Sequence, residues 1–173
     1  MDRPIYVYTY AGVAFDDAVA LLAGDPELLL QDATDVSSAH GDAVLGQLHH
    51  DVAGIEVDRD VVIELGEFDP VELTRSIVPV HWRAARGHAW FPTLDATLEV
   101  SALSTVPPLT QVALVGTYRP PLGPLGAAID AVAAHGIAEA TCHRFVNEVA
   151  SRLEGLAEQA RDEPAVSHAV GSA

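Results

Sequence analysis

Residues 110–130 read TQVALVGTYRPPLGPLGAAID and carry the clearest structural signal in the chain. From 112 to 118 every second residue shares one face of an extended chain, as in a strand that is covered on one side. Pro120 and Pro121 have no backbone N–H to donate, so they end that strand. Pro124 suits the first turn of a helix. The stretch therefore predicts an abrupt passage from the last strand to the last helix.

Apolar residues after this turn recur every three or four positions as far as about residue 160, which predicts an amphipathic helix or two helices in line. Roughly 35 helical residues would span about 50 Å, more than a small domain needs. We therefore expect a break or a bend near Gly136. Residues 1–160 are predicted to form a single domain, and residues 161–173 a disordered tail.

The first half of the chain predicts one strand, two short helices and then more strands. Ile5 to Tyr10 is rich in β-branched and aromatic residues and reads as a strand. Phe15, Val19 and Leu22 have helical spacing, and Asp25 with Pro26 can begin a second short helix. Strands with short connections, which implies antiparallel pairing, are expected within residues 43–54, 55–68, 71–84, 96–103 and 110–118.

The composition excludes several kinds of chemistry. The formal net charge is −16, from 25 acidic residues and 9 basic ones, and every basic residue is an arginine. Without lysine there is neither a Schiff-base amine nor a phosphate-loop lysine. An acidic chain repels phosphodiesters and anionic lipids, so we expect no nucleic-acid partner and no membrane partner.

Cysteine content and apolar runs bear on the cellular compartment. The single cysteine, Cys142, cannot form an intrachain disulfide or a paired-thiolate zinc site. No export signal or apolar run of about 20 residues is present, so a cytoplasmic protein is expected. The arginine-only, alanine-rich composition is typical of a GC-rich bacterial genome.

The second half of the chain resembles a known superfamily. The resemblance is carried by VPVHWRAARGHAWFPTLDATLEVSAL (78–103) and TQVALVGTYRPPLGPLGAAIDAVAAHGIAEATCHRFVNEVASRLE (110–154). The Trp-Arg pair at a strand end, Phe-Pro before the next strand, and Gly-Thr-Tyr followed by Pro-Pro-Leu-Gly are similar to the START-like helix-grip superfamily, SRPBCC, in its bacterial polyketide cyclase-like branch.

That resemblance implies an α+β helix-grip fold. In this fold a curved antiparallel sheet wraps around a long C-terminal helix, two short helices follow the first strand, and a cavity lies between sheet and helix. It implies no catalytic residues, because the superfamily shares none, so it transfers a pocket and not a reaction. Gly116 and Gly136 would either leave room there or allow close packing.

Pocket candidates are the large aromatic, polar and apolar residues of the predicted strands and last helix. Amphipathic aromatic side chains suit a pocket wall, although an ordinary place in the core or at its rim is the alternative for each. The predicted ligand-binding residues are Tyr8, His81, Arg83, Trp90, Leu114, Tyr118, Ile129 and His135.

Three functions remain open from the sequence. The first is binding of an apolar, lipid- or polyketide-like small molecule. The second is an aromatase/cyclase-like enzyme in which a histidine, an arginine and a tyrosine hydroxyl donate protons to a carbonyl. The third is a protein-association domain whose interior is filled by its own side chains. No cofactor is expected, and no metal, since His49 and Asp51 make only a weak two-ligand set. The oligomeric state stays open, a homodimer included.

Overall fold

The computed structural model describes residues 2–26, 29–31, 33–34, 61–66, 69–84, 93–119 and 131–162. Six strands in these ranges form one antiparallel sheet in the order β1-β6-β5-β4-β2, with β3 paired to β4. The strands are β1 (Arg3–Ala11), β2 (Val61–Leu65), β3 (Asp69–Glu72), β4 (Arg75–Ala84), β5 (Thr93–Thr105) and β6 (Pro108–Arg119). The predicted strand within 43–54 lies outside the described residues.

Alternation along the strands produces one covered and one open face. In β5, Leu94, Ala96, Leu98 and Val100 are buried, while Asp95, Thr97 and Glu99 between them are exposed or half-buried. β4 alternates in the same way, and so does β6 apart from Ala113, which is buried although it has the opposite parity. The pairing register places the buried residues of the covered face side by side in all three strands. One face of the sheet is therefore apolar and covered.

A turn interrupts the segment 71–84, which the sequence predicts as a single strand. Leu73 and Thr74 form the turn, and β3 folds back onto β4. The Thr74 carbonyl accepts a hydrogen bond from Ala102 N–H at 2.9 Å. Neither turn residue is a glycine, proline or asparagine, so the sequence has no turn signal at this point.

Two short helical segments follow β1, as predicted. Helix α1 spans Phe15–Gly24. A second segment begins after Asp25, whose carbonyl accepts a hydrogen bond from Leu29 N–H at 3.4 Å, and residues 29–31 and 33–34 are helical. Leu22 and Leu30 are fully buried, so both segments contribute to the core.

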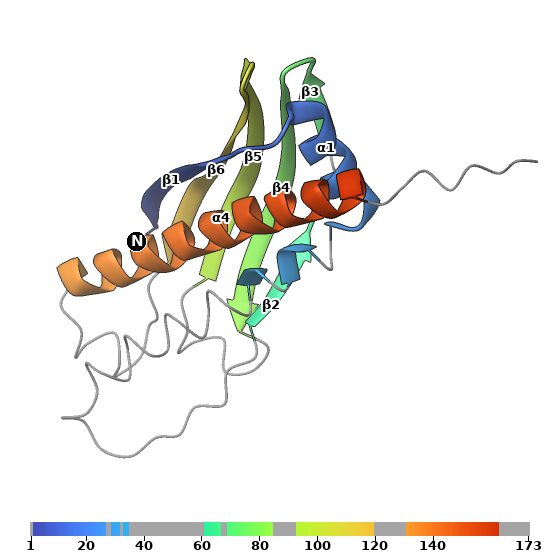
Figure 1. Cartoon of the computed structure of the whole chain (residues 1–173). Helices are drawn as coiled ribbons and strands as arrows, with labels where there is room; N and C mark the ends of the chain where they lie inside the picture. Colours follow the sequence, from blue (N-terminus) through green and yellow to red (C-terminus); the bar gives the residue numbers. More distant parts are fainter. Residues whose placement is uncertain are drawn as a thin grey trace, which may run out of the picture.

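Helix α4 (Ala131–Asp162) crosses the covered face of the sheet (Figure 1). It continues through Gly136, so of the two expected features, a break or a bend, the break does not occur. One glycine costs a helix only about 1 kcal/mol relative to alanine. Phe145, Val149 and Leu153 are fully buried, which places the apolar stripe of α4 against the core. Near the C-terminal end of α4, Glu154 Oε1 accepts a 2.5 Å hydrogen bond from Gly12 N–H.

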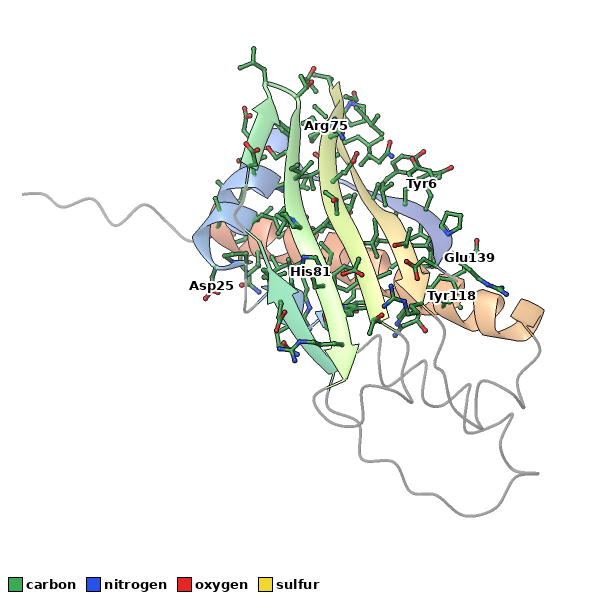
Figure 2. All side chains as sticks on the ribbon, turned by 180° about the vertical axis from the view of Figure 1, so that it is seen from behind. Tyr6, Asp25, Arg75, His81, Tyr118 and Glu139 are labelled. Atoms are coloured by element: carbon green, nitrogen blue, oxygen red, sulfur yellow. The ribbon has the colours of Figure 1, made fainter. Side chains whose placement is uncertain are left out.

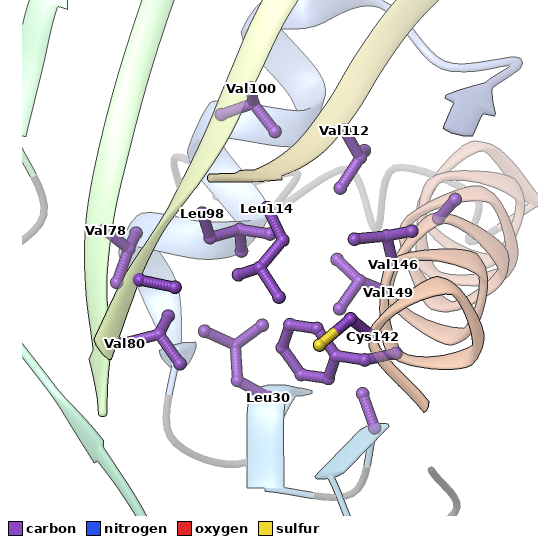
Figure 3. Close-up of a cluster of buried hydrophobic side chains, with 14 of the residues drawn as sticks. Leu30, Val78, Val80, Leu98, Val100, Val112, Leu114, Cys142, Val146 and Val149 are labelled. Carbon is purple, nitrogen blue, oxygen red and sulfur yellow. The ribbon is translucent and has the colours of Figure 1, made fainter. Parts of the chain in front are cut away.

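The core lies between the sheet, α4 and the two short helical segments (Figure 3). Leu98 and Leu114 from the sheet, Leu30 from the second helical segment, and Val146 and Val149 from α4 point into it. The predicted α+β helix-grip class is thus confirmed: an antiparallel sheet holds a long C-terminal helix, and two short helices follow the first strand.

Candidate functional site

The register of the sheet assembles a row of large side chains on the face that α4 covers. Trp82 pairs with Leu94, and Leu94 pairs with Tyr118. Their exposed fractions are 8%, 4% and 3%. These three residues, here called the aromatic row, lie near the end of the sheet where β4 and β6 finish, and each aromatic side chain carries one polar group on an apolar body.

The next row of the same face is narrow in its middle. Val80 pairs with Ala96, Ala96 with Gly116, and Gly116 with Ile5. In this row, here called the small-residue row, Ala96 contributes one methyl group and Gly116 only a hydrogen. The next row again has bulk, since Leu98 pairs with Leu114. The middle of the small-residue row therefore has less side-chain bulk than the rows on either side of it.

Gly116 is required by contact between strands. A Cβ atom at this position would lie 2.2 Å from the Asp95 carbonyl oxygen and 2.5 Å from Ala96 Cα. Such distances are far inside van der Waals contact, so close packing, one of the two predicted roles, applies here between β5 and β6. Gly136 is exposed and a Cβ there would meet nothing within 4 Å. Its missing side chain therefore opens no space in the interior.

Trp82 connects the sheet to both helical layers. Its ring meets the ring of Phe145 edge to face, with centroids 4.9 Å apart. Its indole Nε1–H donates a 3.2 Å hydrogen bond to Thr34 Oγ1, which in turn donates to the Leu30 carbonyl at 2.7 Å. Thr34 is fully buried. The hydroxyl thus accepts one hydrogen bond and donates another, as a buried polar group requires.

Cys142 lies in the same core and is 3% exposed. Burial, and secondly the charge of Glu139, raises the pKa of its thiol from an ordinary 9.0 to about 12. The thiol stays protonated at neutral pH, so it is a poor nucleophile there.

His81 and Arg83 lie on the face of the sheet away from α4. They flank Trp82 in β4, and successive strand residues point to opposite faces. Figure 2 shows the sheet from that outer side, with His81 turned toward the viewer. The prediction that these two residues line the pocket is therefore wrong, because a side chain on the outer face cannot line a space between sheet and helix.

Ion pairs occupy these outer side chains. His81 Nδ1 lies 2.8 Å from Asp95 Oδ1 on the neighbouring strand. Arg83 Nε donates to Glu64 Oε1 at 2.8 Å, and the hydrogen bond from its guanidinium holds the pKa of that carboxyl below its usual value. Both pairs are exposed, so they contribute little to stability.

Tyr8 is also an outer residue and not a pocket residue. It is 43% exposed and alternates with the buried Ile5 and Val7 along β1. Tyr6 and Tyr10 share its face, because alternate residues of a strand point to the same side. The spacing shows which residues share a face, but only the position of α4 shows which face is covered.

The remaining predicted ligand-binding residues lie in three places. Leu114 and Tyr118 are buried on the face that α4 covers, so the structure brings them to the same side of the sheet. His135 lies in the first turns of α4. Trp90 and Ile129 lie outside the described residues, as do His49 and Asp51.

Three interior residues, Trp82, Phe145 and Thr34, were not among the predicted ligand-binding residues. Trp82 shares its parity with the apolar Val78 and Val80, which was the available signal. Phe145 has the helical spacing of the last helix. No sequence pattern marks Thr34, because its partner Trp82 is 48 residues away.

The described part of the chain has neither a metal-binding cluster nor a membrane-spanning helix. Its histidine, cysteine and carboxylate side chains form no group of three or more that could hold a metal ion. None of its helices has both the length and the apolar character needed to cross a membrane.

Comparisons with known proteins give likenesses of fold. No family model matches the sequence, and no curated protein matches it. A conserved protein from Geobacillus kaustophilus is similar in structure, with a TM-score of 0.44 and 13% identity over 90% of this chain and 96% of that one. The Zhui aromatase/cyclase from Streptomyces sp. R1128 is similar with a TM-score of 0.42 and 14% identity over 94% of this chain and 98% of that one. The predicted resemblance to the helix-grip superfamily is one of fold, and the arrangement of sheet and α4 is that fold.

Proposed function

We propose that the protein binds an apolar small molecule of the lipid- or polyketide-like class between the sheet and α4. One observation carries the proposal: the small-residue row lies directly beside the aromatic row, on the covered face. Small-molecule sites are mostly apolar, with large aromatic side chains and few polar groups. The covered face of this sheet has that composition.

The proposed ligand lies over Ala96 and Gly116, with Trp82 and Tyr118 at its side. Side chains at these two positions supply almost no bulk, so an apolar molecule there would contact the larger residues of the flanking rows. Among the described residues, the buried side chains that are polar by class are Thr34, Ser76 and Thr110, and none of them carries a charge. An uncharged ligand suits such surroundings, because burying an unpaired charge is costly.

Simple binding is favoured over an aromatase/cyclase-like reaction by the placement of the proton donors. His81 and Arg83 lie on the outer face, so of the described donors Tyr118 is the one on the covered face. A carbonyl held over Ala96 would therefore be near the Tyr118 hydroxyl but on the opposite side of the sheet from the His81 imidazole and the Arg83 guanidinium.

The first test is native mass spectrometry of freshly purified protein, compared with its mass after denaturation. A co-purified apolar molecule that is released on denaturation supports the proposal. Apo protein that also fails to bind the neutral fluorescent probe N-phenyl-1-naphthylamine contradicts it. A neutral probe is chosen because the chain carries a formal charge of −16 and repels anionic dyes.

The second test fills the small-residue row. Ala96→Leu adds bulk in the middle of the small-residue row. Thr97→Leu adds similar bulk to the neighbouring residue on the outer face and serves as the control. We expect Ala96→Leu to weaken binding of the probe about tenfold or more, with a free energy of unfolding within about 1 kcal/mol of wild type. Thr97→Leu should bind the probe like wild type.

The opposite result supports an interior filled by its own side chains. In that case Ala96→Leu overpacks the core, and its free energy of unfolding falls by about 1–3 kcal/mol. The protein-association reading would then replace the proposal.

A further inference from the structure

We propose that the free edge of β1 is a homodimer interface, where β1 of one copy pairs antiparallel with β1 of a second copy. β1 ends the strand order, and it pairs with β6 without interruption from Arg3↔Tyr118 to Ala11↔Thr110. Among the described strands none pairs with its other edge. An edge strand presents a row of backbone N–H and C=O groups that can pair with another chain.

The edge has few of the features that normally prevent such pairing. Natural edge strands are short, bulged, charged or rich in proline. β1 is nine residues long, and its register with β6 shows no bulge. Its single proline, Pro4, lies near one end. Most of the strand is therefore a regular edge that suits a second strand.

The local charge of this edge permits a second copy to approach it. The chain carries 25 acidic residues against 9 arginines, so most approaches of two copies are repulsive. Residues 3–14 contain no acidic residue. Asp2, just before the strand, is paired with Arg119, whose Nε lies 2.8 Å from Asp2 Oδ1. Residues 3–14 of two copies can therefore come together without placing carboxylates of this segment opposite each other.

The outer side chains of β1 suit this symmetric pairing. Tyr6, Tyr8 and Tyr10 are 58%, 43% and 51% exposed, and neighbouring rings lie 5.8 and 5.6 Å apart. In an antiparallel pair related by a two-fold axis, the outer residues of one strand face the outer residues of the other. The tyrosines of the two copies would therefore be cross-strand neighbours, and aromatic cross-strand pairs stabilise sheets.

The first experiment measures the mass of the full chain in solution by sedimentation equilibrium across the micromolar range. We expect a dimer that tightens as salt is added, because salt screens the repulsion between two acidic copies. Tyr8→Glu should raise the dimer dissociation constant about tenfold or more. Tyr6→Glu is the second variant should Tyr8→Glu fail to fold, with folding checked by circular dichroism.

Leu73→Glu is the matched control, since Leu73 is 96% exposed in the turn between β3 and β4, away from β1. It should dimerise like wild type. A wild-type chain that stays monomeric throughout the micromolar range overturns the proposal. So does equal weakening by Leu73→Glu, because the interface would then not depend on β1.

Cross-linking locates the interface directly. The one cysteine of the chain, Cys142, is buried and protonated at neutral pH, so an introduced cysteine would be the reactive thiol. A short bismaleimide should convert Tyr8→Cys, but not Leu73→Cys, into a covalent dimer. Cross-linking of both to the same extent, or of neither, contradicts pairing through β1.

Discussion

The rings of Trp82 and Phe145 meet edge to face, with centroids 4.9 Å apart and planes inclined by 81°. This contact joins β4 to α4 across the core, although 62 residues lie between the two positions in the sequence. Phe145 is fully buried and Trp82 is 8% exposed. The pair therefore holds the long helix against the part of the sheet that carries the aromatic row.

Truncating Phe145 should loosen this attachment. Phe145→Ala removes a buried ring and leaves a cavity, so the free energy of unfolding should fall by about 3–5 kcal/mol in urea titrations. Leu156→Ala, at a position 39% exposed on the same helix, should cost less than about 1 kcal/mol. Equal losses from the two variants would show that the ring contact contributes nothing special.

The hydroxyl group of Thr34 should contribute more to the free energy of unfolding than its methyl group. Thr34→Val keeps the shape of the side chain but leaves the Trp82 indole N–H without its acceptor, which should lower the free energy of unfolding by about 1–3 kcal/mol. Thr34→Ser keeps the hydroxyl and should cost about 0.8 kcal/mol for the lost methyl. Urea unfolding followed by tryptophan fluorescence measures both, and a Thr34→Val protein as stable as wild type would contradict the prediction.

Substitution by alanine should change stability in opposite directions at Gly116 and Gly136. Gly116→Ala forces a Cβ into the backbone of β5, so it should lower the free energy of unfolding by about 1–3 kcal/mol or more. Gly136→Ala meets no neighbour and lies within α4, so it should raise stability by up to about 1 kcal/mol. Thermal unfolding of the two variants checks the signs, and the prediction is wrong if both move the same way.

Cys142 should make the protein less stable at alkaline pH. Below about pH 8 the thiol is protonated in both states and has no effect on pH dependence. Between 9.0 and about 12 the unfolded chain loses this proton while the folded chain keeps it, so the free energy of unfolding falls as pH rises. The slope approaches about 1.4 kcal/mol per pH unit.

Cys142→Ala is the control for this titration. Other groups titrate alike in both proteins, so the difference between the two stability curves isolates the thiol. That difference should be constant below about pH 8 and should change by about 1 kcal/mol or more by about pH 10.5. Parallel stability curves up to that pH would show that burial does not raise the pKa of the Cys142 thiol.

Much of the fold follows from local sequence patterns. Alternation in 112–118 and spacing of three or four after the turn are properties of neighbouring residues, so they predicted β6 and α4 directly. The turn at Leu73 and Thr74 was missed because tertiary pairing, rather than a turn residue, reverses the chain there. α4 has no break at Gly136 because one glycine costs a helix of 32 residues little.

The candidate site was less predictable than the fold. Alternation groups Tyr6, Tyr8 and Tyr10 on one face and Ile5 and Val7 on the other, but it does not say which face a helix will cover. His81 and Arg83 were misplaced for the same reason: their parity was known, and the side of the sheet was not.

Sequence periodicity was enough to establish the order of strands and helices, because period 2 and period 3.6 arise from geometry within each segment. The interior site required the folded chain. Thr34, Trp82 and Phe145 come from three separate segments, and they meet only when α4 and the short helices close over the sheet. Contacts between remote segments depend on how all their neighbours pack, and no local pattern records that information.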